Sequence, residues 1–359
     1  MKSFRIGGLE IRVPIIQGGM GVGISLSGLA VAVANEGGVG VISCAGLGLL
    51  YKEKAENYIQ SSIEGLKAEL QKARSATKGI IGVNIMVALT NFEDMVKTAI
   101  SEKADIIFAG AGLPLSLPGF LKKDSTTKLV PIVSSGKAAK ILCAKWKANY
   151  DYLPDAIVVE GPKAGGHLGF KREQIDDENF SLETIVPEVV SEVKFFEEKY
   201  NKEIPVIAAG GLYDGADIYN IMQKGARGVQ LGSRFVTTHE CDASDLFKQS
   251  YIESKEDDVQ IIQSPVGMPG RAIGNGFLDK VKQGLKMPQT CPFHCIKTCD
   301  ISSSPYCIIT ALYNAAKGNL KSGYAFCGSN AFRATKVISV KELFTELKEG
   351  FQQKALSFR

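Results

Sequence analysis

Short apolar runs alternate strictly with amphipathic stretches along the chain, and this alternation constrains the fold more than any other feature. Eight runs are rich in β-branched and small apolar residues: 13–17, 38–43, 80–86, 105–110, 130–134, 156–160, 205–209 and 228–231. They are almost wholly apolar, whereas a strand with one solvated face alternates apolar and polar residues. We therefore predict parallel strands that are covered on both faces.

Stretches with helical periodicity separate these runs, for example 53–72, 92–103, 182–199 and 214–224. Eight strands in alternation with helices within about 240 residues match the arithmetic of a (β/α)8 barrel. A doubly wound sheet is the alternative, but it ordinarily uses fewer strands. The predicted fold class is α/β, with a TIM barrel that occupies residues 1–240.

The segments that flank the predicted strands suggest three additions to the barrel. Residues 4–11 read as a hairpin that turns at Gly7-Gly8 and closes the barrel floor. The strand rhythm stops after residue 240, and we expect residues 241–335 to form a small, mostly helical cap that carries a cysteine cluster. Residues 336–359 are expected to contain a C-terminal helix that packs on the barrel.

The composition narrows the possible partners and the location. The chain has 45% hydrophobic and 22% charged residues and a formal net charge of +4, without a basic block interleaved with aromatic residues. No nucleic-acid partner is therefore expected. No apolar run approaches the roughly 18 residues of a membrane span, and no signal-peptide core is visible, so we expect a cytoplasmic protein without a membrane partner. Eight cysteines in 359 residues argue against a disulfide scaffold.

Glycine-rich and polar clusters follow five of the predicted strands. In such a barrel the active site lies at the carboxyl ends of the strands. A Gly-Gly pair after one strand is equally well explained as a tight turn, but five clusters on one rim indicate a binding site. The candidate binding residues in these clusters are Gly18, Gly19, Met20, Asn84, Glu160, Gly165, Gly166, Ala209, Gly210, Gly211, Gln230, Gly232 and Ser233.

The last two clusters favour a phosphate site, because loops after strands seven and eight of barrels often bind phosphate through backbone N–H groups. Ser233 adds a hydroxyl, and Arg234 either neutralises charge or forms a structural ion pair. A phosphate at one end and a glycine-lined slot, with the backbone of Gly19 and Met20 at the ring edge, indicate flavin mononucleotide (FMN). A sugar-phosphate substrate would use the same loops but would leave the glycines after strands one and six unexplained.

One of only three histidines, His167, lies in the segment EGPKAGGHLGF at 160–170. An imidazole exchanges a proton near neutrality more readily than any other side chain, and the neighbouring glycines clear room for a flat ligand. We therefore expect this histidine to contact such a ligand. The alternative is a structural histidine that caps the next helix.

Several motifs together resemble the nitronate monooxygenase family, formerly 2-nitropropane dioxygenases, which also contains the flavin-dependent type II enoyl-acyl-carrier-protein reductases. They are QGGM at 17–20, GVNIM at 82–86, EGPKAGGHLG at 160–169, PVIAAGG at 205–211, VQLGSRF at 229–235 and GRAI at 270–273. The resemblance runs in order over residues 10–275. It implies a barrel that binds FMN without a covalent link at the rim residues named above, with His167 as the catalytic group above the flavin.

The resemblance implies an FMN-dependent oxidoreductase, in the first place a nitronate monooxygenase that oxidises alkyl nitronates with O2. His167 would then deprotonate a nitroalkane or hold the nitronate. The alternative is an enoyl-acyl-carrier-protein reductase that uses NAD(P)H, and basic residues near the rim (Lys163, Lys171, Arg172 and Arg271) suit a carrier-protein partner. A remoter alternative is a flavin- or metal-binding protein whose cap responds to redox state. Each of these three interpretations is compatible with a homodimer.

A cysteine cluster in the predicted cap allows two interpretations. Cys291, Cys295, Cys299 and Cys307, with His294 among them, are candidate ligands for zinc or an iron–sulfur cluster. Their spacing matches neither a zinc ribbon nor a ferredoxin motif. On a helix the first three would form one stripe, as buried structural thiols also would. We assign the cluster no function.

Overall fold

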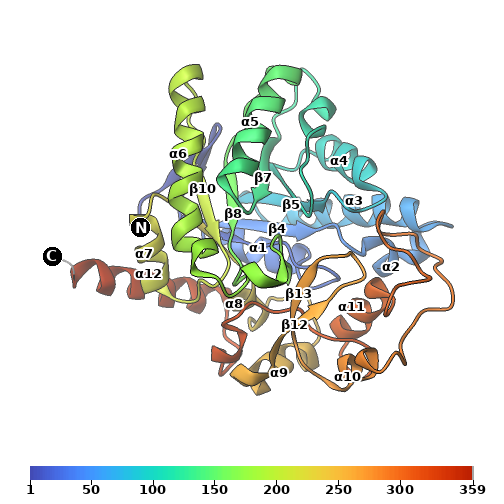
Figure 1. Ribbon diagram of the computed structural model, residues 1–359. Coiled ribbons are helices and arrows are strands. Elements are labelled where there is room, and N and C mark those ends of the chain that lie inside the picture. The colour runs from blue at the N-terminus through green and yellow to red at the C-terminus, as the bar shows by residue number, and fades with distance from the viewer. Residues whose placement is uncertain (358–359) are drawn as a thin grey trace.

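The computed structural model describes residues 1–357, which fold around a closed parallel β-barrel (Figure 1). The strands are β3 (Ile15–Gln17), β4 (Val39–Ser43), β5 (Ile80–Met86), β6 (Ile106–Gly110), β7 (Lys128–Val133), β8 (Ile157–Glu160), β10 (Val206–Ala209) and β11 (Gly228–Leu231). They pair in this order, and β11 closes the ring by pairing with β3. The predicted TIM barrel is confirmed, and all eight strands overlap their predicted runs.

Helices cover the outside of the barrel between successive strands (Figure 1). They are α1 (Ser27–Asn35), α2 (Leu47–Leu50), α3 (Tyr58–Ala76), α4 (Phe92–Ser101), α5 (Gly136–Tyr150), α6 (Leu182–Tyr200), α7 (Gly215–Gln223) and α8 (Ser233–Val236). Helix α3 begins five residues later than the predicted start at residue 53. The Asn57 side chain accepts a hydrogen bond from the Gln60 N–H at 2.9 Å, and this N-cap sets the start of the helix.

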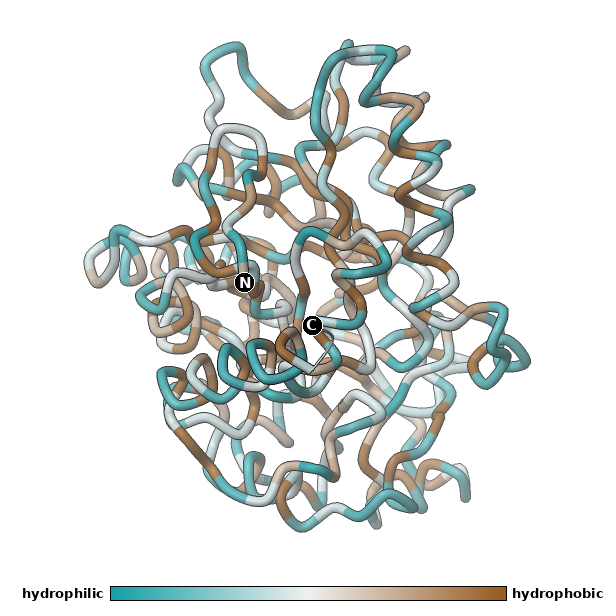
Figure 2. The backbone as a smooth tube through the Cα atoms, turned by 90° about the vertical axis from the view of Figure 1, so that its left-hand side faces the viewer, coloured by the Kyte–Doolittle hydropathy of each residue, from teal (hydrophilic) through white to brown (hydrophobic). Residues whose placement is uncertain are grey.

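Each barrel strand sends alternate side chains into two separate cores. Val39 and Val41 of β4 belong to the cluster inside the barrel, whereas Ile42, which follows Val41, packs against the surrounding helices. Both faces of the strands are therefore apolar, which explains the nearly continuous apolar runs in the sequence. Hydrophilic residues are frequent in the outer loops (Figure 2).

An antiparallel hairpin of β1 (Phe4–Ile6) and β2 (Leu9–Ile11) lies at the amino-terminal end of the barrel. Its buried side chains Phe4, Ile6 and Ile11 join the cluster inside the barrel. The turn uses Gly7 at φ +55°, a conformation that side chains with a Cβ rarely adopt. The hairpin thus fills the floor and leaves the opposite end of the barrel for a site.

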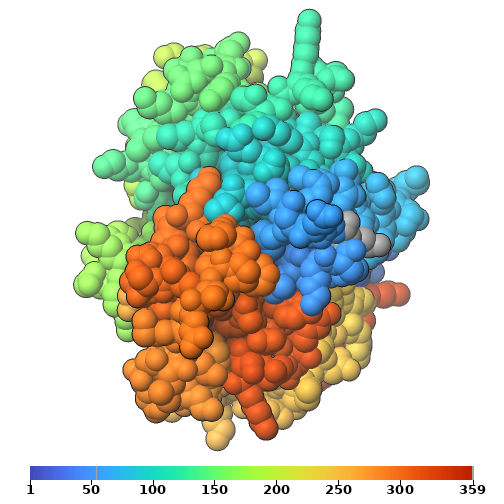
Figure 3. Space-filling view, turned by 90° about the vertical axis from the view of Figure 1, so that its right-hand side faces the viewer, coloured from blue at the N-terminus to red at the C-terminus, as the bar shows by residue number. Residues whose placement is uncertain are grey.

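The chain after the barrel forms α9 (Asp245–Glu253), β12 (Val259–Gln263), β13 (Pro269–Ile273), α10 (Gly276–Lys282) and α11 (Ile308–Ala316). The sequence analysis missed the β12–β13 hairpin, because Pro269 and Gly270 disfavour a strand and both runs are short. β13 also pairs with β9 (Gly166–His167), so a three-stranded sheet joins this segment to the loop after β8. The space-filling view shows this part of the chain, in orange and red, covering one end of the molecule beside the blue amino-terminal segment (Figure 3).

The last helix, α12 (Val340–Leu356), begins at a capping box in which Ser339 and Glu342 exchange hydrogen bonds. It lies against α7 (Figure 1), and a Cβ on Gly215 would come within 2.2 Å of the Phe351 nitrogen. Close approach of the two helices therefore depends on this glycine. None of the helices within residues 1–357 has the length and apolar character needed to cross a bilayer.

Candidate functional site

A cavity of about 410 Å³ opens at the carboxyl ends of the barrel strands. This volume lies in the range of sites for small molecules and cofactors. Every residue predicted to bind cofactor or to act in catalysis lines it: Gly18, Gly19, Met20, Asn84, Glu160, Gly165, Gly166, His167, Ala209, Gly210, Gly211, Gln230, Gly232 and Ser233. The structure therefore brings the whole predicted set together around one space.

Hydrogen bonds from the two strands that neighbour β3, which are β4 and β11, hold the turn after β3 in place. Gln17 is fully buried; its side-chain oxygen accepts a hydrogen bond from Val41 N–H at 2.9 Å, and its side-chain amide donates to the Gly18 carbonyl. The Gly18 N–H donates a hydrogen bond to the Leu231 carbonyl oxygen at 2.8 Å. A Cβ on Gly19 would lie only 2.2 Å from the Cβ of Asn84, so this position accepts glycine alone. The glycines of this turn therefore form a rigid wall of the cavity without a protruding side chain.

Met20, whose backbone groups the sequence analysis assigned to a flavin edge, hydrogen-bonds to Ser25. Its N–H donates to the Ser25 hydroxyl at 2.8 Å, and its carbonyl accepts from the Ser25 N–H at 3.0 Å. Ser25, five residues later, folds back on Met20 and occupies its N–H, which leaves the carbonyl oxygen as the backbone group of Met20 that can accept a further hydrogen bond from a ligand. The Met20 side chain still lines the cavity.

The part of the cavity at the carboxyl ends of β10 and β11 contains polar groups without partners. Gly210 and Gly211 follow β10 at φ +98° and +83°, and within residues 1–357 the N–H groups of Gly211 and Gly232 make no hydrogen bond. The Ser233 hydroxyl accepts from the Gly328 N–H at 2.8 Å and keeps its own proton free. Unpaired N–H and O–H donors at the mouth of β10 and β11 favour an anionic ligand such as a phosphate.

Gly328, Ser329 and Asn330 complete this end of the cavity, and the sequence analysis missed them. The Asn330 amide donates to the Gly211 carbonyl at 2.6 Å, and the Ser329 hydroxyl is buried without a partner among the described residues. Gly165 packs so tightly on this segment that a Cβ would lie 2.7 Å from the Gly328 nitrogen. The only signal in the sequence is a short run of small polar residues, Gly-Ser-Asn, far beyond the last barrel strand.

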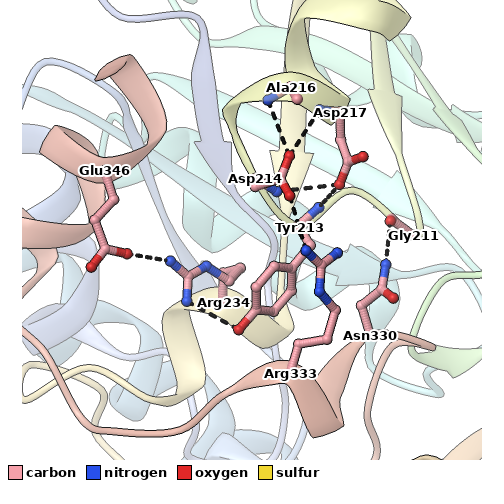
Figure 4. A network of polar contacts seen from close by, with 9 residues as sticks. All are labelled: Gly211, Tyr213, Asp214, Ala216, Asp217, Arg234, Asn330, Arg333 and Glu346. Atoms are coloured by element: carbon pink, nitrogen blue, oxygen red, sulfur yellow. Dashed lines mark hydrogen bonds and ion pairs between the residues drawn. The ribbon is translucent and has the colours of Figure 1, made fainter. Parts of the chain in front are cut away.

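Arg234 lies in a structural ion pair at the edge of this polar end. It donates to Glu346 on α12 at 2.8 Å, and its guanidinium stacks on the Tyr213 ring at 4.5 Å (Figure 4). Arg333 covers the same ring at 4.1 Å and pairs with Asp214 at 2.9 Å. These contacts link the loop after β10 to α12, which carries Glu346, and to the segment that contains Arg333. The Arg234 Nε is buried and has no hydrogen-bond partner within residues 1–357.

Glu160 ends β8 and lines the cavity. Burial raises the pKa of this carboxyl to about 7, because no charged or hydrogen-bonding partner compensates for the loss of solvent. The site therefore contains a carboxyl group that takes up and releases a proton close to neutral pH.

His167 lies on β9 and does not cap a helix, which excludes the structural alternative. Its Nε2 lies 2.7 Å from the Ser264 hydroxyl oxygen, and the edge of Phe326 packs on the ring at 5.0 Å. Burial lowers the pKa of the imidazole to about 4. At neutral pH the ring is therefore uncharged, and it can accept or donate one hydrogen bond at each nitrogen.

Arg271 is buried, so the expectation that it belongs to a basic docking face is wrong. Its Nη1 donates to the carbonyl oxygens of Pro162 and Ala164, both at 2.7 Å, in the loop that leads to His167. The side chain thus fixes this loop from inside the protein. Lys163, Lys171 and Arg172 remain exposed near the same loop; these three residues are the basic side chains left for a docking surface.

The candidate metal ligands Cys291, Cys295, Cys299 and Cys307 lie in an irregular segment, so the first three form no helical stripe. Burial, followed by the charges of Cys307, Cys291 and Cys299, raises the pKa of Cys295 to about 12. Within residues 1–357 no group of three His, Cys, Asp or Glu side chains is arranged to hold a metal ion. All eight cysteines are free thiols.

The chain matches the family described as nitronate monooxygenase over residues 2–102 and 90–350. Among curated proteins, a probable nitronate monooxygenase of Staphylococcus saprophyticus is 29% identical over 308 residues, which cover 78% of this chain and 81% of the relative. A probable nitronate monooxygenase of Staphylococcus aureus strain JH9 is 29% identical over 297 residues, which cover 77% and 79%.

Solved structures agree with the fold. FabK from Thermotoga maritima superposes with a TM-score of 0.74 at 26% identity and covers 97% of this chain and 96% of its own. Nitroalkane oxidase from Streptomyces ansochromogenes has the same TM-score at 19% identity, over 97% and 98% of the two chains, and shows a common fold. With the family match spanning most of its length, the chain belongs to the nitronate monooxygenase family.

Proposed function

We propose that this protein is an FMN-dependent oxidoreductase that oxidises alkyl nitronates with O2. One observation carries the proposal: a single cavity at the carboxyl ends of the barrel strands has unpaired donors at one end and the uncharged imidazole of His167 elsewhere on its wall. The family match and the relatives named probable nitronate monooxygenase support the same activity.

The residues present fit FMN at two points. The N–H groups of Gly211 and Gly232 and the hydroxyl groups of Ser233 and Ser329 are donors for its phosphate. The wall at Gly19, where a Cβ would collide with Asn84, admits the close approach of a flat ring. When bound, FMN supplies the capacity to accept electrons from an organic substrate and to pass them to O2.

His167 would bind and orient the substrate. A nitronate carries negative charge on its two oxygens, and an uncharged imidazole offers an N–H to one of them without the cost of burying a second charge. Phe326, Met268 and Leu312 cover this side of the cavity with apolar surface, which limits the access of water to the substrate. Beyond FMN, the expected partners are therefore a small nitronate and O2.

Reduction of an enoyl thioester with NAD(P)H is the second candidate function. The apolar residues Met86, Leu113, Met268 and Leu312 line the cavity and would suit an acyl chain. The exposed Lys163, Lys171 and Arg172 would provide a basic surface for an acidic acyl-carrier protein. In this reaction the imidazole of His167 would orient the thioester carbonyl.

Anaerobic reduction of the flavin separates the two functions. The protein is saturated with FMN, and its visible absorbance is followed after addition of propane-2-nitronate or of NADH. We expect the nitronate to bleach the flavin and NADH to leave it oxidised. Rapid bleaching by NADH, with return of the colour on addition of crotonyl thioester, would establish the reductase instead. A protein that stays colourless with added FMN would exclude both functions.

A further inference from the structure

The contact between His167 and Ser264 is fixed by the three-stranded sheet that joins the cap to the barrel. His167 is paired with Gly270 of β13, and the Leu168 N–H donates to the Pro269 carbonyl at 2.8 Å. Ser264 directly follows β12, the other neighbour of β13. Ser264 lies in the turn between β12 and β13, which is closed by hydrogen bonds from the Ser264 N–H to the Met268 carbonyl at 3.3 Å and from the Gly267 N–H to the Ser264 carbonyl at 3.0 Å. The turn holds Ser264 Oγ at 2.7 Å from His167 Nε2.

The ring plane of His167 is also fixed. Phe326 packs on the imidazole at 5.0 Å with an interplanar angle of 65°, and Tyr324 packs on Phe326 at 5.0 Å. Gly270 leaves the space that Phe326 occupies, since a Cβ at this position would lie 2.8 Å from the phenyl ring. A rotation of the imidazole that exchanges its two nitrogens would have to displace this stack.

The hydrogen bonds of Ser264 decide which imidazole nitrogen carries the proton. The Ser264 side chain is buried, and its oxygen already accepts a hydrogen bond from the Val266 N–H at 3.3 Å. Within residues 1–357, the acceptor in reach of the hydroxyl proton is Nε2 of His167. If Nε2 carried a proton, two N–H donors would point at one oxygen and the hydroxyl proton would be left without an acceptor. Protein interiors rarely leave such a group unpaired.

We infer that Ser264 donates its hydroxyl proton to Nε2 of His167 and thereby holds the ring in the Nδ1–H tautomer, so that the imidazole presents a hydrogen-bond donor to the cavity. Ser264 is thus a positioning residue that acts through His167.

The surroundings of the second nitrogen agree with this assignment. His167 lines the cavity, and its Nδ1 makes no hydrogen bond within the described residues. Nδ1 is also absent from the polar atoms that are sealed in the protein without a partner, so it is open to the cavity. Since burial lowers the pKa of the imidazole to about 4, the ring carries a single proton at neutral pH.

The tautomer limits the substrate class, and this step depends on the proposed function. A nitronate already carries its negative charge and needs a donor, which Nδ1–H provides. A neutral nitroalkane must first lose a proton from carbon to a base, but the lone pair of His167 is on Nε2 and is engaged by Ser264. We therefore expect preformed nitronates as substrates, with the parent nitroalkanes oxidised much more slowly.

Nitrogen NMR on protein labelled with 15N-histidine tests the tautomer without any assay of activity. The protein has three histidines, and H167Q identifies the signals of His167. At pH 7.5 in the presence of FMN we expect a protonated Nδ1 and an unprotonated Nε2. In S264A the proton should move to Nε2 in a large part of the molecules. A protonated Nε2 in the wild-type protein would overturn the inference.

Two variants control for a change in folding. S264T keeps the hydroxyl group and should keep the wild-type tautomer, so the assignment can be tested even if S264A does not fold. S254A removes a buried hydroxyl that donates to the Tyr251 carbonyl at 2.8 Å elsewhere in the cap. It should leave the signals of His167 unchanged. A proton on Nε2 in S264T would contradict the role of the hydroxyl group.

The substrate preference is tested by kcat/KM for propane-2-nitronate and for 2-nitropropane. Proton abstraction by a positioned base is typically worth about 10²–10⁴ in rate, and we expect the nitronate to be favoured by at least 10². S264A should reduce this ratio, because part of its molecules expose a lone pair. Equal rates with both compounds in the wild-type protein would contradict the substrate assignment. Inactivity toward both, with the Nδ1–H tautomer observed, would refute the proposed function and leave the tautomer standing.

Discussion

Arg271 donates a hydrogen bond from Nη1 to the Ala164 carbonyl at 2.7 Å, although the two residues are 107 positions apart in the chain. The same nitrogen reaches the Pro162 carbonyl at 2.7 Å, and the Arg271 side chain is buried. The contact fixes the loop that leads from β8 to His167, two residues before its pairing with β13. The position of the imidazole therefore depends on the cap as much as on the barrel.

Replacement of Arg271 by methionine should destabilise the protein and slow catalysis. Two buried carbonyl groups would lose a charged donor, which corresponds to about 2–4 kcal/mol in the free energy of unfolding. We expect kcat to fall more than FMN affinity, because the loop orients His167. Urea unfolding and steady-state kinetics measure both effects. The control is R172M, since Arg172 is exposed and should tolerate the change within about 0.5 kcal/mol.

Alanine at position 19 should impair the cavity wall. A Cβ there would lie 2.2 Å from the Cβ of Asn84, so the turn after β3 must move away from β5. Overpacking of this kind costs about 1–3 kcal/mol, and we also expect weaker binding of FMN. Alanine at position 276 is the matched control, because no atom lies within 4 Å of a Cβ there. Equal FMN affinity of G19A and G276A in a fluorescence titration would show that the wall plays no part.

Alanine at position 329 should weaken FMN binding without loss of stability. The Ser329 hydroxyl is buried and unpaired within the described residues, so its removal deprives the flavin-free protein of no hydrogen bond. A phosphate bound at this end would lose one donor, which is worth about 0.5–1.5 kcal/mol, or roughly 2- to 12-fold in Kd. Titration with FMN gives the Kd, and thermal unfolding of the flavin-free protein gives the Tm. A lower Tm together with an unchanged Kd would assign the hydroxyl a structural role.

The sequence predicts those parts of the molecule that depend on local pattern and barrel topology. The strands are recognisable because burial on both faces makes them continuously apolar, and the site residues follow from their position at strand ends, as Asn84 and Glu160 illustrate. Ser264 and Ser329 escaped assignment, and Arg271 was assigned to a docking face rather than to the loop that it fixes. They come from segments without a periodic pattern, and their roles arise from hydrogen bonds between residues far apart in the chain, which no local pattern encodes.

Thiol reactivity should separate two groups of cysteines. Five are buried, namely Cys44, Cys143, Cys241, Cys295 and Cys327. Burial raises the pKa of Cys143, Cys241, Cys295 and Cys327 to about 12 and that of Cys44 further, so these thiols rarely ionise at pH 8. Cys291, Cys299 and Cys307 are half-buried. Ellman's reagent should titrate three thiols quickly in the native protein and all eight in urea. Rapid reaction of more than three would show that at least one buried thiol becomes accessible in the native protein.

The raised pKa of Glu160, whose carboxyl group lines the cavity, predicts a stability that depends on pH. Its pKa is about 7 in the folded protein and 4.5 in the unfolded chain. Between these two pH values the folded protein binds the proton and the unfolded chain does not. The stabilising contribution of Glu160 to the free energy of unfolding is therefore complete below pH 4.5 and is lost as the pH rises to 7. E160Q stays neutral throughout. Its stability relative to the wild type should therefore increase by about 2–3 kcal/mol from pH 4.5 to pH 8.

Urea unfolding of both flavin-free proteins at pH 4.5, 6 and 8 measures this change. His167, whose lowered pKa stabilises the fold as the pH rises from 4 to 6.5, acts in the opposite direction but equally in both proteins, so it cancels in the difference. E203Q is the control, because Glu203 is exposed and its replacement should give no trend with pH. If E160Q and the wild type keep a constant difference across this range, the carboxyl is solvated in the folded protein and does not titrate near neutrality.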